Sequence, residues 1–510
     1  MRALHHLHKG WFLLALALAL LWAVGGAAQA APGQAATRRN LERIIAYLDS
    51  PAYAAEVNAA ENIVLTYQLV RGRAPSPLEF YLIAAYDRIT PISRSTVLSF
   101  VLRDREPGPT WAQAEAFTAR VKPADFRLTP DVRQIAAALS ATPETEIVRE
   151  VQARLAEDTP AAPNAPALAA PRPNVAYNVY YGYLHAHSQL SDGEGTPLEA
   201  YTYAQQQGGL DFFSLTDHGE LMQLWPWQNR WQQLKDAAAA TYQPGAFVTL
   251  WGFEWSNPIL GHMNLMNTDD YTSFLTDFKL GAVADWLAAR PGGFGRFNHP
   301  GSDYPLDLEF RHLQLNPVAV PQMVGIETWN GGSSFNRYYY SGSWENSYSY
   351  WDVGNQNGWY LGALGGQDNH SPNWGTANDF RTAVLAEHLT REEIVDAYQQ
   401  RRFYATEDKD LALDFRSNGY PMGSRLTGLP RTFDVNACDG SGDAFQNLRL
   451  FRNGDLLAEQ AVSGNCFTAA FSDNAAGPAY YYVIVTQTDD NDGNGRPDEA
   501  LSSPIWFDGE

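Results

Sequence analysis

Short apolar runs alternate with helical stretches along the central part of this 510-residue chain, from Val175 to about Asp410. The run YNVYYGYLHAH is followed by the helical stretch TPLEAYTYAQQQ and then by the run LDFFSLTDH, and a later helical stretch is LTREEIVDAYQQ. Strands that alternate with helices are typical of a parallel α/β sheet or barrel. The order of these segments therefore predicts an α/β fold for this part of the chain.

The ends of the strand-like runs carry most of the histidines and several acids. In an α/β barrel the carboxyl ends of the strands meet at one mouth, where active sites lie, and residues i and i+2 of a strand face the same side. The residues at these ends, together with a histidine that closely follows Glu254, are His185, His187, Asp217, His218, Glu254, His262, His299, Asp368 and His370. The pattern predicts that they surround one centre.

Each of these short motifs alone has an ordinary structural explanation. A His-x-His pair can satisfy hydrogen bonds in a core, Asp217-His218 can cap a turn, and Glu254 can be a buried structural carboxylate, although burial without a partner is costly. Together the motifs favour a shared site, because six of the eight histidines after residue 30 fall at or near predicted strand ends. Nitrogen and carboxylate ligands suit Zn, Mn or Fe better than an all-oxygen calcium site.

The stretch HAHSQLSDGEGTPLEAYTYAQQQGGLDFFSLTDHGE resembles the opening of the PHP (polymerase and histidinol phosphatase) metallohydrolase superfamily. The later motifs GFEW, GH, NHP, ETWNG and DNH are most similar to its CehA/McbA-like branch, and the resemblance covers about residues 181–410. It implies a distorted (β/α)7 barrel that holds up to three divalent metal ions.

The resemblance also implies a role for each of nine residues. The implied ligands are His185, His187, Glu254 and Asp368 for a first ion, Glu254, His262 and His299 for a second, and Asp192, His218 and His370 for a third. Of these, Glu254, His187 and Asp368 are the predicted catalytic residues, because ions held close together activate water for hydrolysis. Asp217 is expected to orient a neighbouring group, and for Glu327 a role in the site and packing beneath the barrel mouth both stay open.

Residues 1–30 have the pattern of a secretory signal peptide. Arg2 and Lys9 precede an apolar run from Trp11 to about Val24, and Ala28-Gln29-Ala30 provides small residues for cleavage. A retained membrane anchor is the alternative, since the run approaches the length that spans a bilayer. We therefore expect a secreted or extracytoplasmic protein that is free of the membrane after cleavage.

Three further regions differ from the central one. Residues 37–158 are expected to form a helical accessory domain, and residues 159–174 form an Ala/Pro-rich linker of the extended kind. Residues 411–510 are expected to form a small β-sandwich-like domain, in which RLFRNGDLL is a hairpin with an Asn-Gly turn. Cys438 and Cys466 lie there and are expected either to form one disulfide or to remain two buried thiols.

The same C-terminal region contains a second possible cation site, an acidic loop that starts at Asp490. Its oxygen-bearing residues have the spacing of the first half of an EF-hand calcium loop and are Asp490, Asp492, Asn494 and Asp498. Position twelve is Leu501 instead of the glutamate that the full motif needs, so an exposed acidic hairpin turn is an equal alternative. A calcium ion bound here would be structural.

The composition narrows the choice of substrate. The formal charge of −21, which becomes −23 once Arg2 and Lys9 are removed, disfavours nucleic-acid partners and leaves small molecules. We expect a secreted phosphoesterase with two or three divalent ions (Zn, Mn or Fe); the alternatives are a metal-dependent carbamate, ester or amide hydrolase and a non-enzymatic extracellular binding protein. Arg296, Arg381 or Arg402 can clamp a phosphate, although a surface or loop position is favoured for each.

Overall fold

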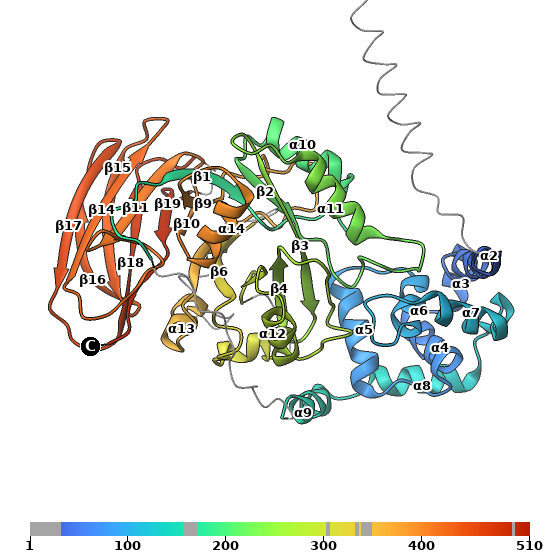
Figure 1. The fold of residues 1–510 in the computed structure, drawn as a ribbon. Coiled ribbons are helices and arrows are strands. Elements are labelled where there is room, and N and C mark those ends of the chain that lie inside the picture. Colours follow the sequence, from blue (N-terminus) through green and yellow to red (C-terminus); the bar gives the residue numbers. More distant parts are fainter. Residues whose placement is uncertain are drawn as a thin grey trace, which may run out of the picture.

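The computed structural model describes residues 32–156, 171–301, 306–331, 336–337, 349–491 and 495–509. The predicted signal peptide and residues 159–170 of the predicted linker lie outside these ranges. Figure 1 shows three regions in a row, with helices at the right, a mixed α/β part in the middle and strands at the left. Within the described part of the chain, every helix falls short of the length and apolar character that a bilayer crossing requires.

The N-terminal region consists of helices that begin at well-formed caps. Ser76, for example, accepts a hydrogen bond from the backbone N–H of Glu79, and Pro77 supplies the first helical residue. The helices are α2 (Pro32–Leu48), α3 (Pro51–Glu56), α4 (Ala59–Arg71), α5 (Pro77–Ile89), α6 (Arg94–Leu102), α7 (Trp111–Arg120), the 3-10 turn η1 (Pro123–Asp125), α8 (Pro130–Ser140) and α9 (Glu144–Leu155). We call residues 32–155 the helical region.

The central part is a curled sheet with helices packed beside it. Its strands, in spatial order, are β1 (Asn178–Tyr183), β2 (Phe212–Leu215), β3 (Val248–Asn257), β4 (Gly261–Met266), β5 (Phe294–Phe297), β6 (Met323–Asn330) and β8 (Gly362–Gly366), and β7 (Asn336–Arg337) also pairs with β6. The helical segments of this part are α10 (Pro197–Gln206), α11 (Arg230–Thr241), α12 (Leu280–Ala288), the 3-10 turn η2 (Glu309–Leu313), α13 (Tyr350–Gln356) and α14 (Arg391–Gln399).

The sheet is mixed, which corrects the expectation of a parallel one. β1, β2 and β3 are parallel, as are β5, β6 and β8, but β4 runs antiparallel to both β3 and β5. The reason is the connection between β3 and β4, residues 258–260, which is far too short for the crossover that a parallel pair requires. The seven-fold (β/α) repeat stays a prediction.

The first and last strands of this curled sheet meet at their carboxyl ends. The backbone N–H of His187 donates to the carbonyl of Asn369 over 2.9 Å, and the N–H of Asp368 donates to the carbonyl of His185 over 3.1 Å. The segments that leave β1 and β8 are therefore held side by side, which places two of the motifs identified in the sequence next to each other.

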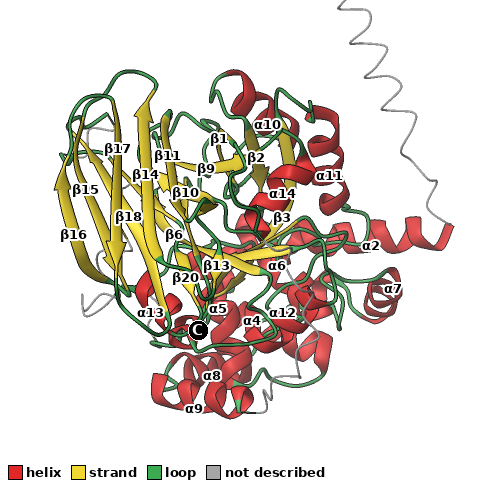
Figure 2. Cartoon of the chain, turned by 60° about the vertical axis from the view of Figure 1, so that its left-hand side comes forward, coloured by secondary structure: helices red, strands yellow, loops and turns green. Residues whose placement is uncertain are grey.

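The C-terminal strands continue this sheet. β9 (Arg381–Ala386) pairs with β1, β10 (Phe403–Thr406) pairs with β9, and β10 pairs in turn with β19 (Glu499–Ser502). Among the described residues sixteen strands form one sheet, which also contains β13 (Arg425–Leu426), β15 (Phe445–Arg452), β16 (Asp455–Ala461), β18 (Ala479–Gln487) and β20 (Ile505–Phe507). We call residues 411–509 the β region. Most of the strands gathered on the left of Figure 2 belong to it.

A second sheet covers part of the β region. It contains β12 (Tyr420–Pro421), β11 (Leu411–Ser417), β14 (Arg431–Asp439) and β17 (Cys466–Asp473), and side chains from both sheets share one core. The predicted hairpin is confirmed: β15 and β16 are antiparallel, and Asn453 and Gly454 at their turn have φ of 52° and 92°. Cys438 and Cys466 form a disulfide between β14 and β17, so the alternative of two buried thiols is wrong.

Candidate metal centre

The structure brings together all nine of the residues that the resemblance implies as metal ligands. They come from the segments that follow β1, β2, β5 and β8 or, for Glu254 and His262, from within β3 and β4. Their ligand atoms form four overlapping groups in which the atoms lie within 4.8 Å of one another: His187–Asp192–His218–His370, His185–His299–Asp368, His185–His187–Glu254 and Glu254–His262–His299. Whether these residues bind metal stays a prediction, but the geometry permits it.

His185, His187 and Asp368 enclose the first of the three expected positions. His185 Nε2 lies 3.1 Å from Asp368 Oδ1 and 3.3 Å from Glu254 Oε1. His187 Nε2 lies 3.1 Å from the same Asp368 oxygen and 3.7 Å from Glu254 Oε2. Asp368 Oδ1 thus lies between the two imidazoles of the His-x-His pair, as expected for a shared ion.

Glu254 connects this position to the second one. Its Oε1 lies 3.3 Å from His262 Nδ1 and 3.4 Å from His299 Nε2, while Asn298 Nδ2 donates to the same oxygen over 2.7 Å. The antiparallel strand β4 is what brings His262 here, because the tight turn after β3 returns the chain directly alongside Glu254.

Asp192 is at the centre of the third position. Its Oδ2 lies 3.3 Å from His218 Nε2, and its Oδ1 lies 3.4 Å from His370 Nε2 and 3.7 Å from His187 Nδ1. His187 therefore faces the first position with Nε2 and the third with Nδ1.

The spacing of these atoms fits bound ions. Four ligands at about 2.1 Å from a tetrahedral ion are separated by about 3.4 Å, and the distances above lie around that value. Imidazole and carboxylate ligands in this number suit transition metals rather than calcium. The donor set thus agrees with the expected Zn, Mn or Fe.

The electrostatics show how closely the charges of the centre are coupled. Burial opposes ionisation of Glu254 and Asp368, but the surrounding histidines outweigh it and hold both carboxyl pKa values well below the usual range. Burial alone would lower the pKa of His218, yet Asp192 and Glu254 raise it to about 10. His187 behaves in the opposite way, because burial and the charge of His370 lower its pKa to about 4.

Glu327 contacts residues of the centre directly. Of the two roles that the sequence left open, the structure therefore favours a role in the site over packing alone. Its Oε1 lies 2.8 Å from His185 Nδ1 and contacts the Arg296 guanidinium, and its Oε2 accepts a hydrogen bond from the His299 backbone over 2.8 Å. A hydrogen bond to Nδ1 fixes the orientation of the His185 ring and leaves Nε2 to face the other ligands.

Asp217 has a similar supporting role, in agreement with its expected function. It accepts hydrogen bonds from the Ser188 backbone and hydroxyl over 2.8 and 2.9 Å, and from the Ser191 hydroxyl over 2.7 Å. These bonds hold the turn that carries Asp192. Ser256, whose hydroxyl contacts His218 Nδ1, was not among the predicted residues; its place two residues after Glu254 on the same strand was the available signal.

The three arginines that could clamp a phosphate are all buried. Arg296 and Arg381 are fully buried, Arg296 beside Glu327 and Arg381 donating to backbone oxygens that include Gly375 and Phe380. The expectation of a surface or loop position is wrong for both, because they belong to the buried strands β5 and β9. Arg402 is also largely buried and pairs with Asp396 over 2.8 Å.

The centre is partly exposed along one edge and buried elsewhere. The side chains of His370, Asp368, Asp192 and His299 are 39%, 22%, 21% and 11% exposed, whereas those of His185, His187 and Glu254 are 0–1% exposed. The exposed part of the centre is therefore the edge formed by His370 and the two aspartates.

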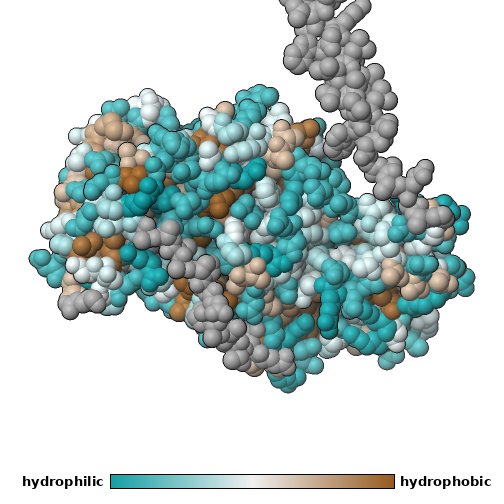
Figure 3. Space-filling model, in the orientation of Figure 1, coloured by the Kyte–Doolittle hydropathy of each residue, from teal (hydrophilic) through white to brown (hydrophobic). Residues whose placement is uncertain are grey.

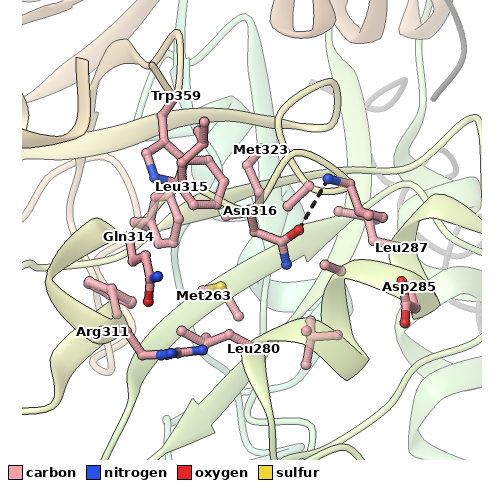
Figure 4. A pocket seen from close by; sticks show the side chains of 17 residues that line it. Met263, Leu280, Asp285, Leu287, Arg311, Gln314, Leu315, Asn316, Met323 and Trp359 are labelled. Carbon is pink, nitrogen blue, oxygen red and sulfur yellow. Dashed lines mark hydrogen bonds between the residues drawn. The ribbon is translucent and has the colours of Figure 1, made fainter. Parts of the chain in front are cut away.

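Other cavities and acidic groups lie apart from this centre. An apolar cavity of about 150 Å³ lies between α12 and the segment around Gln314–Asn316, with Met263 and Trp359 in its wall, as Figure 4 shows. None of the nine residues lines it. Asp408 and Asp410, just before the β region, and Asp439 within it place oxygens within 4.8 Å of one another.

The predicted calcium loop is described only in part. Asp490 Oδ2 accepts a hydrogen bond from the Gly495 backbone over 2.9 Å, and Asp498 Oδ2 accepts one from the Asn491 backbone over 3.0 Å. Asp492 and Asn494 lie outside the described residues. The calcium site therefore stays a prediction.

Comparison with known proteins yields distant relatives. No protein-family model matches the chain. Uncharacterized proteins of Chlamydia muridarum and Chlamydia trachomatis are each 30% identical over 145 residues, or 25% of this chain, and the match spans only 22% of each relative. An uncharacterized protein of Chlamydia pneumoniae is 22% identical over 383 residues, which cover 65% of this chain and 57% of the relative.

Two solved structures are similar at a low level. One is a two-domain protein from Bacteroides vulgatus that contains a predicted PHP-like metal-dependent phosphoesterase, with 18% identity, a TM-score of 0.37 and coverage of 67% of this chain and 100% of that chain. The other is the lesion-specific endonuclease PfuEndoQ from Pyrococcus furiosus, with 13% identity, a TM-score of 0.27 and coverage of 44% and 56%.

Proposed function

We propose that this chain is a metal-dependent hydrolase of the PHP type, of the CehA/McbA-like branch, and that it is a phosphoesterase acting on a small molecule. The observation that carries the proposal is the convergence of nine imidazole and carboxylate side chains into four overlapping groups around Glu254. Six separate strands, or the segments that follow them, supply these side chains, and packing alone gives no reason for so many ionisable groups to be buried together.

The chain's own residues would hold two or three divalent ions and keep their ligands in place. Glu254 directs Oε1 toward His185, His262 and His299 and Oε2 toward His187 and His218, which suits a carboxylate that bridges two ions. Ions bound there supply a nucleophile by lowering the pKa of water and neutralise charge on the substrate oxygen. Glu327 and Asp217 hold the ligand-bearing segments so that this geometry is present before substrate binds.

Access and charge support a small substrate. The open edge at His370, Asp368 and Asp192 leads to an otherwise buried centre, and the formal charge of −21 repels long polyanions. The alternative of a carbamate, ester or amide substrate is favoured by one observation. Arg296 and Arg381 are buried, so neither lies at the open edge where it would bind a phosphate.

The decisive experiment combines metal analysis with a substrate panel. We expect two or three ions of Zn, Mn or Fe per purified chain, and turnover of a phosphomonoester or phosphodiester in preference to a carboxyl ester, a carbamate or a short single-stranded DNA. Preference for a carboxyl ester or carbamate would select the alternative hydrolase. Fewer than about 0.2 ions per chain with no turnover would leave the binding-protein interpretation.

Glu254→Gln tests the centre with little change in shape. Because Glu254 contacts ligands of all three positions, its loss is expected to lower activity by more than the about 10- to 100-fold that loss of an outer residue costs. The matched control is Glu115→Gln, since Glu115 is an exposed residue of α7. Turnover of Glu254→Gln equal to that of the control would overturn the proposal.

We also propose that the protein acts outside the cytoplasm. The support is the pattern of residues 1–30 and the disulfide between Cys438 and Cys466, a bond typical of oxidising compartments. The N-terminal sequence of the protein purified from its native cells is expected to start just after Ala30. A chain that retains Arg2 and Lys9 would contradict cleavage.

A further inference from the structure

The helical region is packed directly against the candidate metal centre. Leu78, Leu82 and Tyr86 of α5 belong to the same core as side chains of the central sheet. The Tyr86 ring lies 6.2 Å from the His218 ring and 5.5 Å from the Phe274 ring. The C-terminal end of α5 therefore lies beside one of the predicted ligands.

The chain segment after His218 strengthens this attachment. Trp225, which is 4% exposed, packs into the separate core of the helical region. The hydroxyl of Ser99 on α6 donates to the carbonyl of Leu224. The helical region thus contacts the central part at His218, through Tyr86, and again at Trp225.

Thr90, at the C-terminal cap of α5, reaches the centre itself. Its backbone N–H donates to the Tyr86 carbonyl over 2.8 Å, and its side chain is 1% exposed. Its Oγ1 lies 3.2 Å from Asp192 Oδ2 and 3.5 Å from His218 Nε2. These are the two atoms that face each other across 3.3 Å in the third position.

We propose that Thr90 is a positioning residue of the third ion site, so that the helical region is a working part of the metal centre rather than an accessory. This inference rests on the proposed function. Asp192 lies in a turn, and its side chain is 21% exposed, so a contact from a buried hydroxyl restricts the carboxylate and keeps Oδ2 directed at His218. The Thr90 hydroxyl donates that contact from a buried helix end, while Asp217 holds only the turn.

Thr90→Val removes the hydroxyl and keeps the shape of the side chain. We expect the third ion to bind about 10- to 100-fold more weakly and the other ions to bind as in the unmodified protein, because the loss of a hydrogen bond to a ligand typically has this effect on metal affinity. The measurement is titration of Zn²⁺ into the ion-free full chain, with the number of ions per chain after dialysis as a second readout. Thr90→Ser restores the hydroxyl and is expected to bind within about threefold of the unmodified protein.

Thr66→Val is the matched control. Thr66 lies on α4, is 0% exposed, and its hydroxyl has no hydrogen-bond partner among the described residues. The variant thus removes a buried threonine hydroxyl from the same region without touching the centre. Its ion binding is expected to equal that of the unmodified protein.

The outcomes separate this inference from the proposed function. If the unmodified chain binds no ions, the proposed function fails. If it binds three and Thr90→Val binds the third with unchanged affinity, or if it binds only two, the inference alone is overturned. Thr90→Ala is made in parallel because alanine cannot clash; unfolding of both variants while Thr66→Val folds would show a purely structural role and would also overturn the inference.

Discussion

The helical region and the β region flank the same central sheet but are attached to it by different kinds of contact. The β region is attached through backbone hydrogen bonds as well as side chains, because β19 pairs with β10 from Thr406 to Tyr404 and extends the sheet, and Tyr482 and Trp506 also belong to the central core. The helical region is attached through side chains, with an apolar face of α5 and the Trp225 segment at the contact.

This difference shows which flank can influence the chemistry. A strand pairing extends the sheet at its edge, and the contacts of the β region with the middle of the molecule include Asp352 of α13, whose Oδ1 accepts hydrogen bonds from the hydroxyls of Tyr480 and Tyr482 over 3.0 and 3.3 Å. Side-chain packing places the end of α5 over the strand ends, where Thr90 contacts two predicted ligands. We infer that the helical region has a functional attachment and the β region a structural one.

The largest expected effect tests the two attachments as a pair. Trp225→Ala and Phe433→Ala each empty a large buried site, in the helical core and the β core respectively, at a cost of about 3–5 kcal/mol in stability. We expect only Trp225→Ala to lower the number of ions bound per chain, as measured by metal analysis of the folded protein. An equal loss of ions from both variants would remove the distinction.

Removal of the disulfide probes the β region alone. Cys438 and Cys466 are 28 residues apart in the sequence and join neighbouring strands, so replacing both with serine is expected to cost about 3 kcal/mol of stability. Denaturant unfolding of the double variant, followed by Trp fluorescence, gives the change. Ion content and turnover in native buffer are expected to stay as they are, and a loss of either would show that the β region reaches the centre.

The smallest effect concerns the contact between α13 and β18. Burial raises the pKa of Asp352 from 3.8 to about 6, so the folded chain binds this proton more tightly than the unfolded chain. The stability that the bound proton provides is present below about pH 4 and is lost as the pH rises through 6. Asp352→Asn is expected to raise the thermal midpoint by about 1–3 °C at pH 8 relative to the unmodified chain and to have no such effect at pH 4.

The face drawn in Figure 3 offers no comparable contrast between the two flanks. Figure 3 shows a largely hydrophilic face with scattered apolar patches over both ends of the molecule, in keeping with an excess of acids over bases. The distinction between the flanks therefore lies in buried contacts, which Trp225→Ala and Phe433→Ala are designed to reach.

Much of the candidate centre could be predicted because its signal is local. The strand-end motifs His185-Ala186-His187 and Asp217-His218 fall where a buried run stops, and the carboxyl ends of neighbouring strands meet. All nine expected side chains are indeed close together. Their roles as ligands, and the number and kind of ions, stay predictions.

The remaining features depend on contacts between distant parts of the chain. The antiparallel course of β4 follows from a three-residue connection, which was visible in the sequence but was outweighed by the expectation of alternating strands and helices. The burial of Arg296 could not be foreseen, since its partner Glu327 lies on another strand. The continuation of the central sheet into the β region likewise depends on the pairing of β10 with β19.

The sequence by itself determined which ionisable side chains the candidate centre contains, because the identity of each side chain and its position at or near a strand end follow from local patterns. The tertiary structure alone decided which parts of the chain surround these side chains. Thr90 and Asp192 are 102 residues apart, and no sequence pattern near either residue predicts their contact. They meet because apolar burial fixes α5 against the central sheet, and burial of this kind is a property of the whole fold rather than of any segment.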